Sequence, residues 1–379
     1  MKQLLSMKKI YLALLELVLL TTSVSVQAKC PKVTEVMSII SKVNHHWQQI
    51  HPKPTSSFWD NSVYHTGNME AFLLTGDSAF YQYSLAWAEH NEWKGAKSDD
   101  KTSWKYHYGE SNDYVLFGDQ QVCFQTYIDL YNLKPEAYKI ARTKEVMEYQ
   151  ISTPNKDYWW WVDGLYMVMP IMTKLYKLTH NPLYLEKQHE YWTYAGSIMY
   201  DEEEGLYYRD AKYIFPKHKT KNGKKDFWAR GDGWAFAALA KVLKDLPKDN
   251  QYRAEYIERF QRMARSIIAC QQKGGYWTRS MLDTEFAPGP ETSGTAFFTY
   301  GLLWGLNNGL LDKAIYKKPA LRAWKYLAKV ALQEDGSVGY VQPIGEKAIP
   351  GQVVDKTSTA NFSVGAFLLA ACEMARFVK

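Results

Sequence analysis

The sequence has little cysteine and no recognisable metal-binding motif. Only four of its 379 residues are cysteines, and no two of them form a CxxC pair. Cys123, Cys270 and Cys372 lie among apolar residues in helix-like stretches, so we expect buried thiols there rather than disulfides. The sequence also lacks an HExxH motif, paired histidines and any cluster of cysteine with histidine. It therefore predicts no metal site.

Long hydrophobic runs and strongly basic segments are also missing. The apolar run Ile10–Leu20 is too short to cross a bilayer well. Lysines precede it and small residues up to Ala28 follow it, which is typical of a cleaved signal peptide at residues 1–28. The formal net charge is only +6, and Lys217–Lys225 is predicted to be a solvated loop. We therefore expect neither a membrane segment nor nucleic acid as a partner.

Aromatic residues, in contrast, are abundant. They make up 15% of the chain, with 14 Trp and 28 Tyr. Their flat apolar faces and polar edges suit both packed cores and sugar rings. No linker rich in Pro, Ser or Gly divides the sequence after the leader, so residues 29–379 are predicted to form a single domain.

A recurring unit of two helices organises this domain. The segment Thr75–Tyr81 ends one helix and opens the next, and Leu178–Tyr184 does the same. Looser versions begin at Leu133, Leu246 and Leu311. The starts lie roughly 50 to 70 residues apart, which fits a helical hairpin with a longer loop. Five junctions and a sixth pair predict an all-α fold, a closed (α/α)6 barrel with a funnel lined by loops.

Two carboxylates stand out in the turns that precede the predicted inner helices. Asp119 follows Phe117, and Asp163 follows four aromatic residues and a valine. An unpaired carboxylate in such surroundings is costly unless it is used or satisfied. Burial also raises the pKa of a carboxyl group, which suits a general acid. Asp119 and Asp163 are therefore the candidate catalytic residues, and such a pair is typical of enzymes that cleave glycosides.

Other residues in these turns are candidates for contact with a ligand. The planar guanidinium of Arg230 matches a carboxylate. At least one of the aromatic residues at positions 158–161 should line the funnel, and we expect Trp161 to do so. Trp59, in the first turn, is a further candidate. Three polar residues in the turns are equally well explained as helix N-caps, namely Asp60, Asp232 and Ser293.

Four segments are distinctive in combination: WVDGLYM at Trp161–Met167, WARGDGW at Trp228–Trp234, ETSGTAF at Glu291–Phe297 and VGAFLLA at Val364–Ala370. With them, the chain from about Trp59 onward resembles glycoside hydrolase family 105, the unsaturated rhamnogalacturonyl hydrolases. That family is related to the unsaturated glucuronyl hydrolases of family 88. The resemblance implies an (α/α)6 barrel, in agreement with the repeats.

The resemblance also implies a reaction. Family members remove a 4,5-unsaturated uronic acid from the non-reducing end of oligosaccharides left by polysaccharide lyases, without a metal or organic cofactor. An acid protonates C4, water adds at C5, and the hemiketal opens and expels the remaining sugar. By resemblance, Asp163 is the general acid and base and Asp119 is the second required carboxylate, ionised to stabilise charge at C5. The positions expected around the substrate ring are Trp161, Trp228, Arg230 and Trp234.

One position departs from the family pattern. Family members often carry a His in the segment before WARGDGW, where this chain has Arg209. Arg209 is a candidate contact for an acidic group. His65 either compensates for the missing family histidine by contacting substrate, or is a helix histidine with a satisfied hydrogen bond. The leaving sugar stays open between rhamnogalacturonan, arabinogalactan glucuronate and ulvan fragments. Pectin fragments, a periplasmic location and a monomer or weak homo-oligomer are expected.

Three alternatives share parts of this pattern. A family 88 hydrolase acting on glycosaminoglycan fragments keeps the chemistry and changes the leaving sugar. A helical-toroid polysaccharide lyase would use Tyr or His to abstract the C5 proton, whereas these turns offer Asp. A glycan-binding protein without activity would use the aromatic residues and Arg230 but leave Asp119 and Asp163 unexplained.

Overall fold

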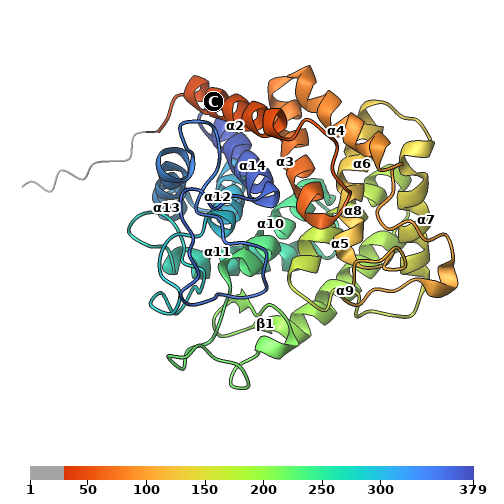
Figure 1. The fold of residues 1–379 in the computed structure, drawn as a ribbon. Helices are drawn as coiled ribbons and strands as arrows, with labels where there is room; N and C mark the ends of the chain where they lie inside the picture. The colour runs from red at the N-terminus through yellow and green to blue at the C-terminus, as the bar shows by residue number, and fades with distance from the viewer. Residues whose placement is uncertain (1–29) are drawn as a thin grey trace, which may run out of the picture. The chain divides into compact units, whose positions relative to one another are not determined.

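A ring of six inner helices organises the computed structural model, which describes residues 30–379 (Figure 1). Each inner helix contacts the next one, and the last contacts the first, so the ring is closed. The inner helices are α3 (Trp59–Thr75), α6 (Cys123–Leu133), α8 (Asp163–Thr179), α10 (Ala229–Asp245), α12 (Thr292–Asn307) and α14 (Asn361–Phe377). The predicted leader at residues 1–28 lies outside the described residues.

Each inner helix pairs with one outer helix. Five of the outer helices follow their inner partners in sequence: α4 (Ser78–His90), α7 (Tyr138–Ser152), α9 (Leu183–Met199), α11 (Arg253–Ala269) and α13 (Lys313–Tyr326). The sixth hairpin joins the two ends of the described chain, because α2 (Val33–Ile50) packs on α14, as Figure 1 shows in red and blue. The predicted all-α (α/α)6 barrel is confirmed.

The burial pattern explains which helices face inward. On the outer helix α11, one stripe of residues at helical spacing packs inward and the rest of the helix faces solvent. The buried residues of this stripe include Tyr256, Phe260, Met263 and Ile267. On the inner helix α14, every residue from Phe362 to Ala375 is buried. A helix without a polar face is stable only between other helices, which places α14 in the inner ring.

The inner ring is closed by a tight contact between α3 and α14. A Cβ atom built on Gly365 would lie 2.3 Å from the carbonyl oxygen of Val63, and one built on Gly67 would lie 2.2 Å from the carbonyl oxygen of Gly365. Any side chain at either position would force the two backbones apart. Glycine at both positions therefore lets the last inner helix seat against the first.

The barrel has chemically different ends. The N-termini of the inner helices lie at one end, together with the short helix α5 (Gly118–Gln121), the hairpin of β1 (Tyr200–Asp201) and β2 (Leu206–Tyr207), and the turns η1 (Lys101–Ser103) and η2 (Ala211–Tyr213). The π-helical turn η3 (Leu327–Ala331) extends α13. The long loops at this end are available to build a site.

An ionic cluster closes the opposite end of the barrel. Glu70 of α3 accepts hydrogen bonds from Lys244 of α10 at 2.5 Å and from Arg376 of α14 at 2.9 Å. Burial alone would raise the pKa of Glu70, but these two cations outweigh burial and hold that pKa far below its usual range. The cluster ties three inner helices together near their C-termini.

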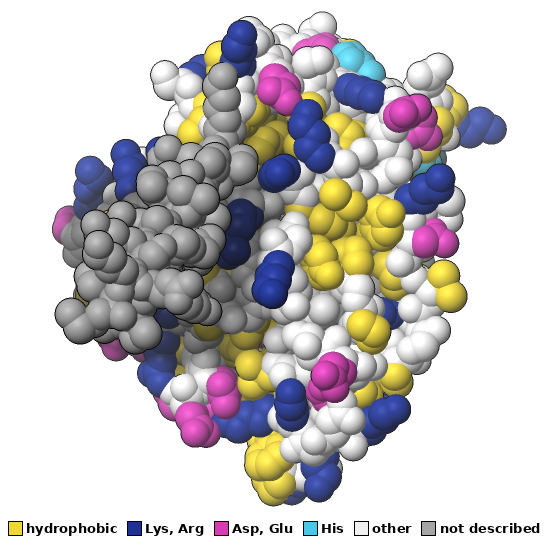
Figure 2. Space-filling view, turned by 90° about the vertical axis from the view of Figure 1, so that its left-hand side faces the viewer, with side chains coloured by type: hydrophobic (Ala, Val, Ile, Leu, Met, Phe, Trp, Pro, Cys, Tyr) yellow, Lys and Arg dark blue, Asp and Glu magenta, His cyan; other side chains and the backbone are white. Residues whose placement is uncertain are grey.

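The structure also shows the state of the cysteines and the distribution of charge on one face. All four cysteines are free, and the Cys123 and Cys372 thiols are buried, as expected, while Cys270 is half-buried. No helix in residues 30–379 is long and apolar enough to cross a membrane. On the face shown in Figure 2, the Lys and Arg side chains of the described residues are scattered among other types rather than gathered in a stripe.

Candidate active site

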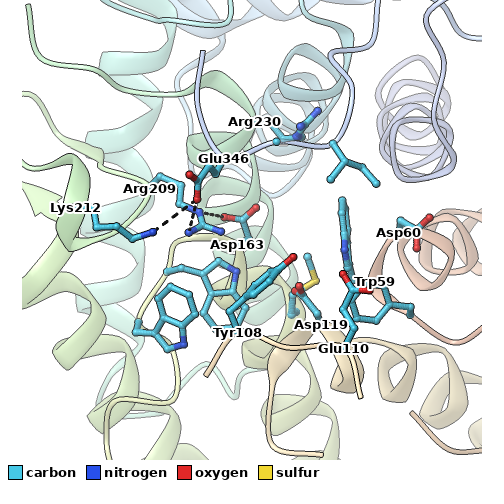
Figure 3. Close-up of a pocket in the computed structure, with 16 residues that line it drawn as sticks. Trp59, Asp60, Tyr108, Glu110, Asp119, Asp163, Arg209, Lys212, Arg230 and Glu346 are labelled. Atoms are coloured by element: carbon cyan, nitrogen blue, oxygen red, sulfur yellow. Dashed lines mark ion pairs between the residues drawn. The ribbon is translucent and has the colours of Figure 1, made fainter. Parts of the chain in front are cut away.

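A cavity of about 600 Å³ opens at the end of the barrel where the inner helices begin (Figure 3). This volume falls in the range of small-molecule sites. Its lining combines aromatic faces with charged groups, which suits an acidic sugar. The lining residues are Phe58, Trp59, Asp60, Tyr108, Glu110, Asp119, Trp160, Trp161, Asp163, Met167, Arg209, Lys212, Arg230, Ile344, Gly345 and Glu346.

Asp163 is the first residue of α8, directly after the aromatic run. Its side chain is 15% exposed, and its Oδ2 lies 3.7 Å from Nε of Arg209. Burial raises the pKa of Asp163, while the positive charges of Arg209 and Arg230 offset part of that rise. The result is a carboxyl group that holds its proton more strongly than a free aspartate does.

Asp119 belongs to the short helix α5 and is 8% exposed. Burial raises its pKa well above the usual value, and repulsion from the nearby Asp163 raises it further. Two carboxyl groups that share a site in this way retain a proton between them. Arg209 lies within ion-pair distance of Asp163, and its positive charge opposes the rise in the pKa of both carboxyl groups. The raised pKa favours the protonated form of Asp119 in the free protein, and its ionisation beside a bound substrate stays a prediction.

Arg209 connects Asp163 to the rim of the cavity. Its Nη1 donates to Asp210 Oδ2 at 2.6 Å and lies 3.4 Å from Glu346 Oε2. Its guanidinium also lies over the Trp160 ring, 5.7 Å from the centroid. A planar cation with several donors can serve all of these partners at once, whereas an imidazole has only two ring nitrogens. Arg209 thus lies in the cavity lining, beside the candidate acid.

Arg230 lines the cavity from α10, and its guanidinium is clamped between two rings. The Trp228 centroid lies 4.6 Å from Cζ and the Phe362 centroid lies 4.8 Å away. Nη1 donates to the carbonyl of Gln342 at 2.6 Å and Nη2 to that of Pro343 at 2.8 Å. Burial lowers the pKa of Arg230. No carboxylate in the described residues forms an ion pair with it, although the charges of Glu291 and Asp163 act on it from a greater distance.

Trp161 and Trp59 also lie in the cavity lining. The Trp161 ring packs against Phe117, with centroids 4.8 Å apart, and against Trp160 at 4.9 Å. Figure 3 shows Trp59 on the side of the cavity opposite Arg209 and Lys212. The structure therefore brings together Asp119, Asp163, Arg209 and Arg230, with these two tryptophans around them.

Trp228, Trp234 and His65 do not line the cavity. Trp228 is 2% exposed and donates from Nε1 to Gln342 Oε1 at 2.8 Å, so it supports the loop that contacts Arg230. Trp234 lies about one helical turn beyond Arg230 on α10 and is fully buried, with its ring centroid 4.4 Å from that of Phe297.

His65 has the satisfied hydrogen bond that was the alternative to a substrate contact. Its Nδ1 lies 2.9 Å from Ser84 Oγ, and its ring stacks on Trp87 with centroids 3.9 Å apart. Burial lowers the pKa of His65 well below its usual value. A neutral, buried imidazole of this kind packs the barrel wall between α3 and α4.

None of the three possible N-caps, Asp60, Asp232 and Ser293, caps its helix. Asp60 lines the cavity. Asp232 is fully buried inside α10, where its Oδ1 accepts a hydrogen bond from the backbone N–H of Tyr207 at 2.8 Å. The cap of α12 is Glu291, which accepts hydrogen bonds from the backbone N–H groups of Ser293 and Gly294.

Sequence reasoning missed the loops that complete the cavity. Tyr108 and Glu110 come from the loop before α5, Lys212 from the loop after β2, and Ile344 and Glu346 from the loop before α14. These loops have no periodicity that predicts where their side chains point. The available signal was charge and aromatic content in long loops at the same end of the barrel.

Comparison with known proteins identifies the family. The family model described as Glycosyl Hydrolase Family 88 matches residues 26–378. The chain belongs to glycosyl hydrolase family 88. A solved structure described as glycosyl hydrolase family 88 from Bacteroides vulgatus is 64% identical, with a TM-score of 0.90 over 92% of this chain and 100% of that one. Another, described as a polysaccharide lyase, is 71% identical, with a TM-score of 0.90 over 91% of this chain and 98% of that one.

A curated relative adds a more specific name. An unsaturated 3S-rhamnoglycuronyl hydrolase of Formosa agariphila is 34% identical over 348 residues, which cover 86% of this chain and 87% of the relative. A possible family 105 member from Salmonella enterica is 17% identical, with a TM-score of 0.73 over 91% of this chain and 95% of that one, and it supports the barrel fold alone. The protein is a glycoside hydrolase, and its family implies an oligosaccharide substrate.

Proposed function

We propose that this family 88 enzyme removes a 4,5-unsaturated uronic acid from the non-reducing end of lyase-generated oligosaccharides. The observation that carries the proposal is the pairing, in one cavity, of two carboxyl groups with raised pKa values and a guanidinium without a carboxylate partner. The carboxyls supply acid and base, and Arg230 supplies a counter-ion for the uronate. The name of the Formosa agariphila relative supports the same substrate class.

The reaction follows from the electron distribution of the substrate. The double bond of a vinyl ether is electron-rich at C4, so Asp163 transfers its proton there and the positive charge develops at C5 and the ring oxygen. The Asp163 carboxylate then takes a proton from water as the water oxygen bonds to C5. The hemiketal opens to a ketone at C5, and C1 becomes an aldehyde as it releases the leaving sugar with its hydroxyl. One water is consumed and the acid is restored.

Substrate binding places the proton where this reaction needs it. In the free enzyme, the charges of Arg209 and Arg230 favour the ionised form of Asp163. A uronate bound to Arg230 cancels part of that positive charge and excludes water, and both effects raise the pKa of Asp163. The proton held by the pair then moves toward Asp163, and Asp119 becomes the anion that stabilises the charge at C5.

The parent polysaccharide is the finer part of the proposal. We assign pectin fragments of the rhamnogalacturonan type, with other uronate glycans as the alternative. We also propose that residues 1–28 direct export to the periplasm, where lyase products would be met, and that the enzyme acts as a monomer or weak homo-oligomer. Cell fractionation and the mass of the purified protein in solution test these two points.

The test follows the ultraviolet absorbance of the conjugated double bond. Wild type and Asp163→Asn are mixed with lyase-digested rhamnogalacturonan and, separately, with lyase-digested glucuronate polymers. Wild type should abolish the absorbance of at least one digest, and the variant should be slower by about 10²–10⁴-fold or more. Glu258→Asn, on the exposed face of α11, is the control and should match wild type. Absorbance that persists with wild type in both digests refutes the proposal.

A polysaccharide lyase is the second candidate, because a 71% identical solved structure is described as one. A lyase removes the C5 proton of a saturated uronate and creates the double bond, so absorbance would rise rather than fall. Tyr108 is a possible base in the lining, but burial and the nearby Glu110 and Asp119 raise the pKa of its phenol. A raised pKa disfavours the phenolate that this chemistry requires. Rising absorbance with an undigested polymer would favour the lyase.

A further inference from the structure

A carboxylate of the enzyme already occupies the cationic part of the cavity rim. Glu346 lies in the loop before α14 and is 45% exposed. Its Oε1 accepts a hydrogen bond from Tyr213 Oη at 2.7 Å, while Oε2 lies 3.4 Å from Arg209 Nη1 and 3.9 Å from Lys212 Nζ. Figure 3 shows Glu346, Arg209 and Lys212 together on one side of the cavity.

The charges in this part of the rim balance without a ligand. Arg209 is faced by Asp163, Asp210 and Glu346, and Lys212 is faced by the last two of these at 3.8 Å and 3.9 Å. Asp210 and Glu346 therefore balance the two cations even when Asp163 holds its catalytic proton. Burial would raise the pKa of Glu346, but the hydrogen bond from Tyr213 and the adjacent cations lower it, so its charge persists.

The other carboxylates in the lining lie away from this cluster, and the neighbouring Lys347, whose charge also lowers the pKa of Glu346, does not line the cavity. Glu110 and Asp60 line the cavity away from Arg209 (Figure 3). Arg230 is the lining cation without a carboxylate partner in the described residues, and the proposed function assigns it to the unsaturated uronate. No lining cation in residues 30–379 is thus left for a second anionic group on the ligand.

We infer that Glu346 is a specificity-determining residue that selects a leaving sugar without negative charge. The inference rests on the proposed function and extends it to the sugar released next to the unsaturated uronate. A sulfate or carboxylate on that sugar would meet Glu346 at the position where Arg209 and Lys212 would otherwise attract it. Like charges placed together in a binding site discriminate strongly against the wrong partner.

The experiment compares two disaccharides that differ only in charge, an unsaturated uronate linked to rhamnose and the same compound with one sulfate on the rhamnose. For wild type, kcat/KM should be about tenfold or more higher for the neutral compound. Glu346→Gln should reduce this ratio to about threefold or less, and Glu346→Asp should keep most of it because the charge remains. The control Glu258→Gln should leave the ratio and the activity unchanged, since Glu258 lies on the exposed face of α11.

Salt provides a second measurement on wild type that depends on no variant. Repulsion between charges near solvent is screened as ionic strength rises, so the ratio should shrink between low and high salt. A wild-type preference for the sulfated compound, or a ratio that neither salt nor Glu346→Gln changes, overturns the inference while leaving the proposed function intact. Failure of wild type to consume either compound, together with unchanged absorbance in both lyase digests, overturns both.

Discussion

Replacing Gly365 with alanine tests the contact that closes the barrel. The new Cβ would lie 2.3 Å from the Val63 carbonyl oxygen and 2.8 Å from Tyr64 Cα, whereas ordinary contacts begin at 3.4 Å. Both obstacles are backbone atoms, so α3 must move by about 1 Å as a unit. Overpacking of this kind costs about 1–3 kcal/mol or more, and alanine regains up to about 1 kcal/mol as the better helix former. We expect a net loss of about 1–2 kcal/mol in the free energy of unfolding.

Gly196→Ala in the outer helix α9 is the matched control. The atom nearest to its new Cβ would be Arg259 Nη1 at 3.5 Å, an ordinary contact, so this variant should gain about 0.5–1 kcal/mol. The two variants should therefore differ by about 1.5–3 kcal/mol in urea denaturation followed by circular dichroism. Gly365→Ala should also lose activity, because α3 carries Trp59 to the cavity. Equal stabilisation by both substitutions would refute the tight contact.

Three further substitutions test the charges. Arg209→Gln removes a cation that lowers the pKa of Asp163. The alkaline limb of the kcat/KM profile, where the acid loses its proton, should therefore move to higher pH. An unmoved limb would contradict the pairing of Arg209 with Asp163. Arg230→Gln should lower kcat/KM about 10- to 100-fold, with a raised KM, because a charge-assisted hydrogen bond to the uronate carboxylate is lost. An equal loss with an amidated uronate would argue against a carboxylate contact. Glu70→Gln leaves two partly exposed cations facing each other and should lower the free energy of unfolding by about 1–3 kcal/mol, a value discounted for that exposure. Urea denaturation measures this loss, and the folded enzyme should stay active. Full stability would contradict the ionic cluster.

The fold was predictable because most of its helix pairs are local in sequence. Junctions such as Thr75–Tyr81 join helices that are neighbours along the chain, and the apolar character of residues 362–374 marks an inner helix. The sixth pair was not visible as a repeat, because α2 and α14 are separated by nearly the whole chain. Contacts between distant segments leave no periodic signal in a single sequence.

The site was predictable where its residues stand in turns at helix N-termini. Asp163 and Arg230 lie in the first turn of their helices, and closure of the ring brings them to one cavity. Trp234 belongs to the same motif as Arg230 but lies four residues further along α10, inside the barrel. An α-helix rises about 1.5 Å per residue, so the chain passes from the cavity at Arg230 to the core at Trp234 within one motif.

Glu346 was not predictable in the same way. It reaches the cavity from a loop whose path depends on hydrogen bonds that Arg230 and Trp228 make to Gln342 and Pro343. These contacts join segments more than a hundred residues apart, so only the folded chain places the Glu346 carboxylate beside Arg209.

The proposed function requires that the enzyme hydrates the double bond rather than cleaving the glycosidic bond directly. An unsaturated uronide with sulfur in place of the linking oxygen tests this claim, because sulfur is a poor site for acid-assisted cleavage at C1 but does not affect protonation at C4. Loss of ultraviolet absorbance and release of thiol would be followed together for the sulfur- and oxygen-linked compounds. The account predicts comparable rates for both compounds with wild type and loss of both with Asp163→Asn. Rapid turnover of the oxygen-linked compound alone would contradict it.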